Sequence, residues 1–173
     1  MLTRIIIKSQ PYGLSLVLVL VWVAVALGGG FQITVETPSS TDPELKGAVL
    51  VVRTFGCYQP TDAALSGTAE GLVNGRRQSM PIQLTPTSKG IYAIKQQWPA
   101  QGVWVLAITG TYRGLTSSAL VELGPNGKVQ AATGKGSGLP VQIVSRKLSA
   151  GEIEAALKNL ASKVNQKTRA SAK

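Results

Sequence analysis

The chain has 173 residues, and its 18 Lys and Arg against 8 Asp and Glu give a formal net charge of +10. It contains no His and one Cys, which excludes an intramolecular disulfide, a His-dependent catalytic triad and a His-based copper or zinc site. The positive charge directs attention to anionic partners, but no nucleic-acid recognition motif accompanies it. We therefore expect no specific nucleic-acid binding, and an anionic lipid surface is the charged partner that this composition favours.

Residues 1–30 carry the features of an export segment. Arg4 and Lys8 precede the uncharged apolar run Leu14–Leu27, whose length is typical of a signal-peptide core. Ala24-Val25-Ala26 has the small-x-small pattern of a cleavage site, whereas the longer stretch Tyr12–Phe31 comes close to the ~20 residues that span a bilayer. The segment is thus either a signal peptide or a membrane anchor. In both cases the rest of the chain is expected outside, periplasmic or anchored to the cytoplasmic membrane.

Residues 31–148 have the composition and periodicity of a mainly β domain. Gly and Pro separate short runs rich in Val, Ile, Leu and Thr, which predicts many short strands joined by turns. Phe31–Glu36 alternates as either a first strand or a tether, and Ala48–Thr54 is apolar enough for a strand buried on both faces. Asn74-Gly75 predicts a tight hairpin between Ala64–Leu72 and Gln78–Leu84.

The central stretch Gly90–Leu123 alternates large apolar with polar residues, which predicts three strands folding back on one another as a meander. The turns are expected at Pro99–Gly102 and around Arg113 and Gly114. Trp98 and Trp104 lie among the alternating apolar residues, so we expect both side chains to be at least partly buried.

The segments on either side of this meander are predicted to be turns, a loop and short strands. Thr85–Gly90 is predicted as a turn, and Lys128–Ala132 is expected to pair with Leu115–Leu123 across a tight turn. Gly134–Pro140 is predicted as a flexible surface loop, and Val141–Ser145 as the last strand.

The pattern changes to a helical period near the C-terminus. Ser149 and Glu152 have the spacing of a capping box, and the following apolar residues form one stripe. The stripe includes Ile153, Leu157, Leu160 and Val164. It must be buried, either on the chain's own sandwich or, as a partner-docking helix, against a protein partner or the membrane surface. We predict that deleting residues 149–173 leaves the sandwich folded but abolishes association with a membrane partner or surface. Thr168–Lys173 loses the pattern and is predicted to be disordered.

Few residues suggest chemistry. Cys57 is either a small buried hydrophobic residue or a residue with a chemical role. In the second case it is a reactive thiol, one half of an intermolecular disulfide or a soft-metal ligand. A binding surface could be built from Cys57, Tyr58, Arg76, Arg77, Tyr112 and Arg113. The acids Asp42, Glu44, Asp62, Glu70 and Glu122 are dispersed. Because no two of them are placed together by the sequence, we expect no catalytic site and no bound cofactor or metal.

One group of residues resembles a known family. Gly90-Ile91-Tyr92, followed by Trp98-Pro99, Gly102, Trp104 and Leu106, resembles the G-x-Y and P-x-x-G-x-W-x-L core of YtkA-like and FixH-like exported domains. The resemblance covers roughly residues 46–123 and implies an immunoglobulin-like β-sandwich outside the cytoplasmic membrane. Some members of the family are linked to copper handling or oxidase assembly. This chain departs from them because it has no His and only Met1 and Met80.

The resulting prediction has three parts. Residues 1–30 are a signal peptide or anchor, residues 31–148 an immunoglobulin-like β-sandwich, and residues 149–173 an amphipathic helix with a basic tail. The expected function is that of an exported, non-enzymatic binding or accessory module at the outer face of the cytoplasmic membrane, as a subunit of a membrane protein complex. The alternative is a periplasmic soft-metal (copper) chaperone that uses Cys57.

Overall fold

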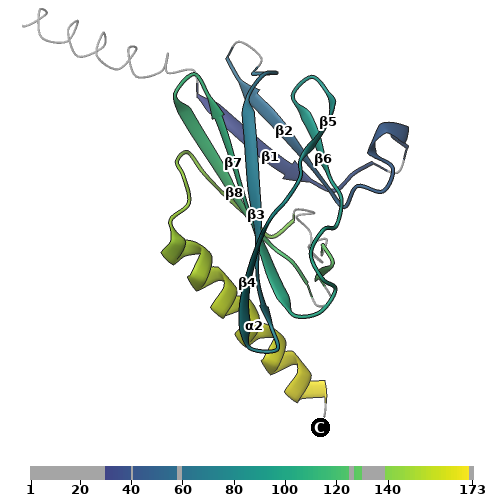
Figure 1. The fold of residues 1–173 in the computed structure, drawn as a ribbon, viewed down its shortest axis with the longest axis vertical. Coiled ribbons are helices and arrows are strands. Elements are labelled where there is room, and N and C mark those ends of the chain that lie inside the picture. Colours follow the sequence, from purple (N-terminus) through teal and green to yellow (C-terminus); the bar gives the residue numbers. More distant parts are fainter. Residues whose placement is uncertain (1–29, 40, 58–59, 125–126, 130–138, 172–173) are drawn as a thin grey trace, which may run out of the picture.

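A computed structural model describes residues 30–39, 41–57, 60–124, 127–129 and 139–171. Within these ranges the protein is mainly β, with two antiparallel sheets packed face to face and a long C-terminal helix lying along the outer face of one of them (Figure 1). The predicted signal peptide or anchor, residues 1–29, lies outside the described residues. Neither helix in the described ranges has the length and apolarity that a membrane span requires.

The first sheet has the strand order β1-β2-β6-β5. Its strands are β1 (Phe31–Glu36), β2 (Leu50–Gly56), β5 (Thr85–Ser88) and β6 (Ile91–Ile94). Phe31–Glu36 is therefore a strand of the domain and not a tether. The turn expected at Thr85–Gly90 contains the short strand β5 instead, which tolerates Pro86 because it lies at the sheet edge, where one side needs no donor. The short 3-10 helix η1 (Pro43–Leu45) places Leu45 over the outer face of this sheet, against Val51 and Ala93.

The second sheet has the order β4-β3-β7-β8-β9. Its strands are β3 (Ala64–Val73), β4 (Arg76–Pro81), β7 (Val103–Tyr112), β8 (Leu115–Glu122) and β9 (Val141–Val144). The predicted Asn74-Gly75 hairpin joins β3 to β4, with φ angles of 52° and 75° that suit a type I′ turn. Arg113 and Gly114, with φ angles of 47° and 79°, make the same kind of turn between β7 and β8.

The predicted meander is only half correct. β8 pairs along its whole length with β7, but β6 belongs to the other sheet, so the residues between Ile94 and Val103 cross from one sheet to the other. Alternation along a strand shows which side chains are buried, but it does not show which neighbour supplies the hydrogen bonds. For the same reason the partner of β8 was misassigned: β8 pairs with β7 and β9, and of the expected strand Lys128–Ala132 the described residues Lys128 and Val129 are not in a strand. Residues 130–132 lie outside the described residues.

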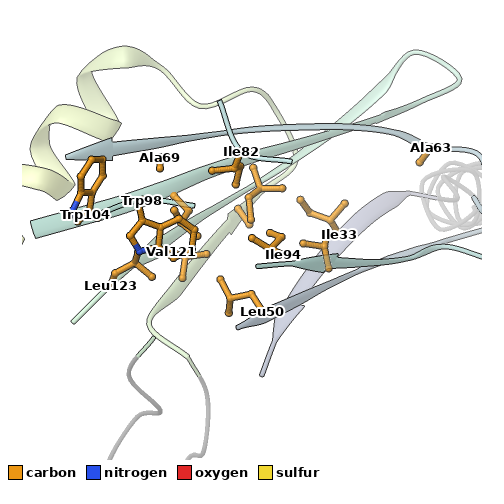
Figure 2. Close-up of a cluster of buried hydrophobic side chains, with 14 of the residues drawn as sticks. Ile33, Leu50, Ala63, Ala69, Ile82, Ile94, Trp98, Trp104, Val121 and Leu123 are labelled. Atoms are coloured by element: carbon orange, nitrogen blue, oxygen red, sulfur yellow. The ribbon is translucent and has the colours of Figure 1, made fainter. Parts of the chain in front are cut away.

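The two tryptophans lie in the core between the sheets, as expected, with exposures of 3% for Trp98 and 0% for Trp104 (Figure 2). Each indole N–H is satisfied: Trp98 Nε1 donates to the carbonyl of Gly127 at 2.8 Å, and Trp104 Nε1 donates to the carbonyl of Gln101 at 2.8 Å. Around them the core combines side chains of both sheets, including Ile33, Leu50 and Ile94 from the first and Leu106, Ile108 and Val121 from the second.

The C-terminal helix α2 (Ala150–Ser171) packs on the outer face of the second sheet. Leu157 and Leu160 are buried there against Val103 and Val105 of β7, so β7 is covered on both faces. The helix continues to Ser171, which corrects the expectation of disorder from Thr168 up to that residue. Once packing holds the first turns in place, each further helical residue adds a hydrogen bond at little additional cost.

Ion pairs hold α2 on both sides of this apolar contact. Glu70 of β3 and Glu122 of β8 are both register partners of Val105, so they lie on the same face of the sheet, one strand to either side of β7. On the β3 side, Arg77 Nη2 is 3.0 Å from Glu70 Oε2 and Arg77 Nε is 3.3 Å from Glu154 Oε2 of the helix. On the β8 side, Lys163 Nζ of the helix is 2.9 Å from Glu122 Oε2. The helix is therefore oriented by charge as well as by burial.

The start of α2 has the predicted capping box. Ser149 Oγ accepts a hydrogen bond from the Glu152 N–H at 3.2 Å, and the Glu152 carboxylate accepts one from the Ser149 N–H at 2.9 Å. Arg146 adds two further hydrogen bonds to the same carboxylate, at 2.8 and 2.7 Å. The Arg146 guanidinium, followed by the backbone and the hydroxyl of Ser149, holds the pKa of Glu152 well below its ordinary value.

This cap makes the stability of the protein depend on pH in acid. Because the pKa of Glu152 is lower in the folded than in the unfolded chain, its contribution is complete above the unfolded value of about 4.3 and is lost as the pH falls toward the depressed folded value. We expect Glu152→Gln to lower the urea midpoint near neutral pH, and the gap between variant and parent to narrow as the pH drops below about 4. A gap that stays constant would contradict this assignment.

Candidate functional site

The described residues that sequence patterns suggested for one binding surface lie at two opposite ends of the sandwich. Strand β3 runs from Ala64, which pairs with Thr111, to Leu72, which pairs with Val103. With about 3.3 Å per residue, Ala64 and Leu72 are about 26 Å apart along the strand. Tyr112 and Arg113 are at the first end, where β1 also begins, and Arg76 and Arg77 are at the second (Figure 1). We call these the proximal and the distal end.

At the distal end the two arginines differ in what they contact. Arg77 is occupied by Glu70 and Glu154 and serves to tie β4 and the helix together. Glu70 is itself fixed by Ser79, whose Oγ donates to it at 2.8 Å. Arg76 is exposed at the start of β4. The structure therefore gives Arg77 a structural role and separates both arginines from Tyr112 and Arg113.

At the proximal end an aromatic pair supports a cation. The rings of Phe31 and Tyr112 lie 5.9 Å apart between centroids, tilted by 38°, and join the start of β1 to the end of β7. The Arg113 guanidinium lies over the Tyr112 ring, 5.2 Å from its centroid, within the range of a cation–π contact. The aromatic pair thus supports an exposed positive charge, that of Arg113, at the β7–β8 turn.

Cys57 lies at the same end, directly after β2, and its thiol is exposed. The interpretation of Cys57 as a small buried hydrophobe is therefore wrong. The reason is its position: at Gly56 the strand reaches its last partner, Phe31, so the next residue leaves the sheet toward solvent. Tyr58, the neighbouring candidate, lies outside the described residues.

A cavity of about 290 Å³ opens beside Cys57 at the proximal end. Thr54, Phe55 and Gly56 line one side of it, and Lys89 and Gly90, from the β5–β6 turn, line another. The Thr54 hydroxyl shapes the floor by donating to the Pro60 carbonyl at 2.7 Å. Phe55 is 48% exposed beside the opening. The proximal end therefore combines a hollow, an apolar ring, a thiol and a cation.

A second, larger hollow of about 480 Å³ lies between α2 and the β8–β9 edge. Its lining is mixed, with the apolar residues Leu120 and Val141 and the polar residues Gln142 and Asn159. The Glu122–Lys163 ion pair lies among its lining residues. Because that pair belongs to the contact that orients the helix, the hollow is a by-product of helix packing and not our preferred site.

The four residues of the expected partner-docking helix are placed on the chain's own sheet. Leu157 is 0% and Leu160 is 7% exposed, and Ile153 and Val164 pack against the same cluster. The stripe is therefore not available to a partner in the folded chain. Of the two alternatives, the structure shows packing on the own sandwich, because the outer face of β7 carries apolar residues that need the same cover.

The chemistry on offer at the proximal end is that of binding. Phe55, Lys89 and Leu115 were not singled out from the sequence, and only the tertiary structure brings them to the same end as Cys57 and Arg113. The sequence did hold one indication that Leu115 is exposed. It directly follows the two-residue turn Arg113-Gly114, so it is the first residue of β8, at the end of the sheet. Within the described ranges, no three of the Cys, Asp and Glu side chains gather as a metal site. No protein-family model, curated protein or solved structure matches this chain.

Proposed function

We propose that the protein is an exported, non-enzymatic binding or accessory module at the outer face of the cytoplasmic membrane and a subunit of a membrane protein complex. The observation that carries the proposal is the short distance in sequence between two features. The apolar run Leu14–Leu27, with Arg4 and Lys8 before it, is followed after three residues by Phe31, where the first strand begins. A β domain that follows such a run so closely is delivered outside, and it stays next to the membrane when the run is retained as an anchor.

The strand order supports the immunoglobulin-like form of this proposal. Immunoglobulin-like domains have strands A, B, E and D in one sheet and C, F and G in the other, with C′ beside C in some types. Taken in chain order, β1-β2-β6-β5 corresponds to A-B-E-D, and β4-β3-β7-β8 corresponds to C′-C-F-G. The strand β9 and the helix α2 are additions after the last of these strands. This order agrees with the family that the Gly90 to Leu106 segment resembles.

The location of the domain is tested by reporter fusions after Lys173. We expect a reporter that works only outside the cytoplasm, such as a periplasmic phosphatase, to be active, and a cytoplasm-dependent fluorescent protein to be dark. Removing the charges of Arg4 and Lys8 together should lower the activity of the periplasmic reporter relative to that of the cytoplasmic one, while a charge-preserving Lys8→Arg variant should not. Activity of the cytoplasmic reporter alone in the parent would refute export.

The alternative function, a soft-metal chaperone, is favoured by one observation: the thiol of Cys57 is exposed and not buried. One thiol without imidazole is a poor copper site, since Cu(I) prefers several soft ligands. We expect Cu(I) to bind weakly and without a defined stoichiometry, as measured by competition with a chromogenic chelator. Tight one-to-one binding that is lost in Cys57→Ser and kept in Arg76→Ser would instead establish the chaperone function.

A further inference from the structure

Two large hydrophobic side chains are exposed among the described residues, Phe55 at 48% and Leu115 at 45%, and both lie at the proximal end. Phe55 precedes Gly56, which pairs with Phe31, and Leu115 pairs with Tyr112, which packs on Phe31. The two are thus linked through the residue at which β1 begins. An exposed hydrophobic residue alone is ordinary on a protein surface, so it is their position at the same end that calls for an explanation.

The cations at this end complement the apolar side chains. Lys89 is exposed at the β5–β6 turn, and Arg113 is exposed at the β7–β8 turn. Asp62, which follows the cavity residue Thr61, is an exposed acid at the same end, so two exposed cations stand against it. Aromatic and aliphatic side chains combined with Lys and Arg are what a protein surface needs to contact the headgroup region of an anionic bilayer.

The chain itself leads to this end. Three residues separate Leu27, the last residue of the apolar run, from Phe31, so four residue steps join the two, and a fully extended chain of that length reaches about 14 Å. If the apolar run is retained in the membrane, the beginning of β1 cannot move farther than this from the bilayer. The distal end, with the Asn74-Gly75 turn and the C-terminal end of α2, then points away from the membrane (Figure 1).

We propose that the proximal end of the sandwich, with Phe55, Lys89, Arg113 and Leu115, lies against the headgroup region of an anionic bilayer. The inference rests on the proposed function in its anchored form, with the N-terminal run retained. It adds an orientation: the distal end, with Arg76 and the C-terminal end of α2, faces away from the bilayer. The C-terminal end of α2 is thereby directed away from the membrane surface, which was one of the alternatives that the sequence left open for the helix.

The single native cysteine offers a probe at the proximal end. The full chain is reconstituted into vesicles of phosphatidylcholine and phosphatidylglycerol that contain a lipid with a nitroxide at a shallow acyl position, and Cys57 carries an environment-sensitive fluorophore. The matched control carries the same fluorophore at the distal end, as Arg76→Cys in a Cys57→Ser background. We expect the lipid nitroxide to quench the label at Cys57 several-fold more than the label at the distal position.

A second variant tests the side chains themselves. The double variant Phe55→Ser, Leu115→Ser should show less quenching of the label at Cys57 while the protein remains in the vesicle fraction. For the protein without these substitutions, vesicles of phosphatidylcholine alone should also lower the quenching, but by less than the double substitution does. Both substituted positions are exposed, so folding should be kept, as circular dichroism can show. Equal quenching at both ends, stronger quenching at the distal end, or a chain that does not stay with the vesicles would overturn the proposal.

Two further outcomes separate this inference from the proposed function. In the first, the reporter fusions show export, but the label at Cys57 is not quenched in these vesicles or in vesicles with a larger share of phosphatidylglycerol. The orientation is then refuted and export stands. If the label at Cys57 is shielded in native membranes and not in these vesicles, the proximal end contacts a protein, and the lipid assignment is refuted.

Discussion

Replacement of Trp104 by alanine is expected to lower the free energy of unfolding by about 3–5 kcal/mol, the range found when a large buried aromatic side chain is removed. The ring is completely buried between the sheets, and its N–H donates to the Gln101 carbonyl at 2.8 Å. Truncation leaves a cavity that the two sheets cannot close, because strands on both sides hold their spacing by hydrogen bonds. Denaturant unfolding followed by circular dichroism measures the loss as a lower midpoint.

Two companion variants show whether the ring occupies the site that the structure assigns to it. Gly71 is the register partner of Trp104, and a Cβ added there would collide with the six-membered part of the indole. Gly71→Ala should therefore also destabilise the protein, by about 1–3 kcal/mol. Gly151→Ala, at a helical glycine with open space around it, should be neutral or slightly stabilising. A loss below about 1 kcal/mol for Trp104→Ala would place the ring outside the core.

Deletion of residues 149–173 is expected to unfold most of the protein, which reverses the expectation drawn from the helical stripe alone. The deletion exposes Val103 and Val105 of the central strand β7 and removes the two buried leucines that cover them. Leu157→Ala alone should cost about 2–5 kcal/mol. Because typical domains have only about 5–15 kcal/mol of stability in total, loss of the whole helix should leave little cooperative unfolding transition.

A shorter deletion is the control. Removing residues 165–173 keeps the four stripe residues that pack on the sheet, the last of them Val164, and also Lys163, which pairs with Glu122. We expect this variant to unfold at nearly the same denaturant concentration as the parent. If the long deletion instead keeps a sharp transition at an unchanged midpoint, the helix contributes nothing to the sandwich and the stripe serves another partner.

The placement of the candidate arginines at two different ends of the sandwich could not be predicted from the sequence. One tight turn directly precedes Arg76 and Arg77, and the other directly follows Tyr112 and includes Arg113; both turns were correctly predicted. That the two turns lie at opposite ends follows from the antiparallel pairing of β3 with β7, which joins residues about forty positions apart. No local pattern specifies that pairing, because the residues on both strands alternate in the same way.

The sequence by itself determined the local structure of this protein: the turn at Asn74-Gly75, the alternation along the strands, the burial of Trp98 and Trp104, and the cap and apolar stripe of the C-terminal helix. Each depends on backbone conformation or side-chain spacing within a few residues. Only the tertiary structure decided that β6 joins the opposite sheet from β7, that the helix covers the second sheet, and that Cys57 is exposed beside Phe55. These features depend on contacts between distant residues, such as the buried hydrogen bond from the Ile33 N–H to Ser117 Oγ, 84 positions away, which form only when both sheets are assembled.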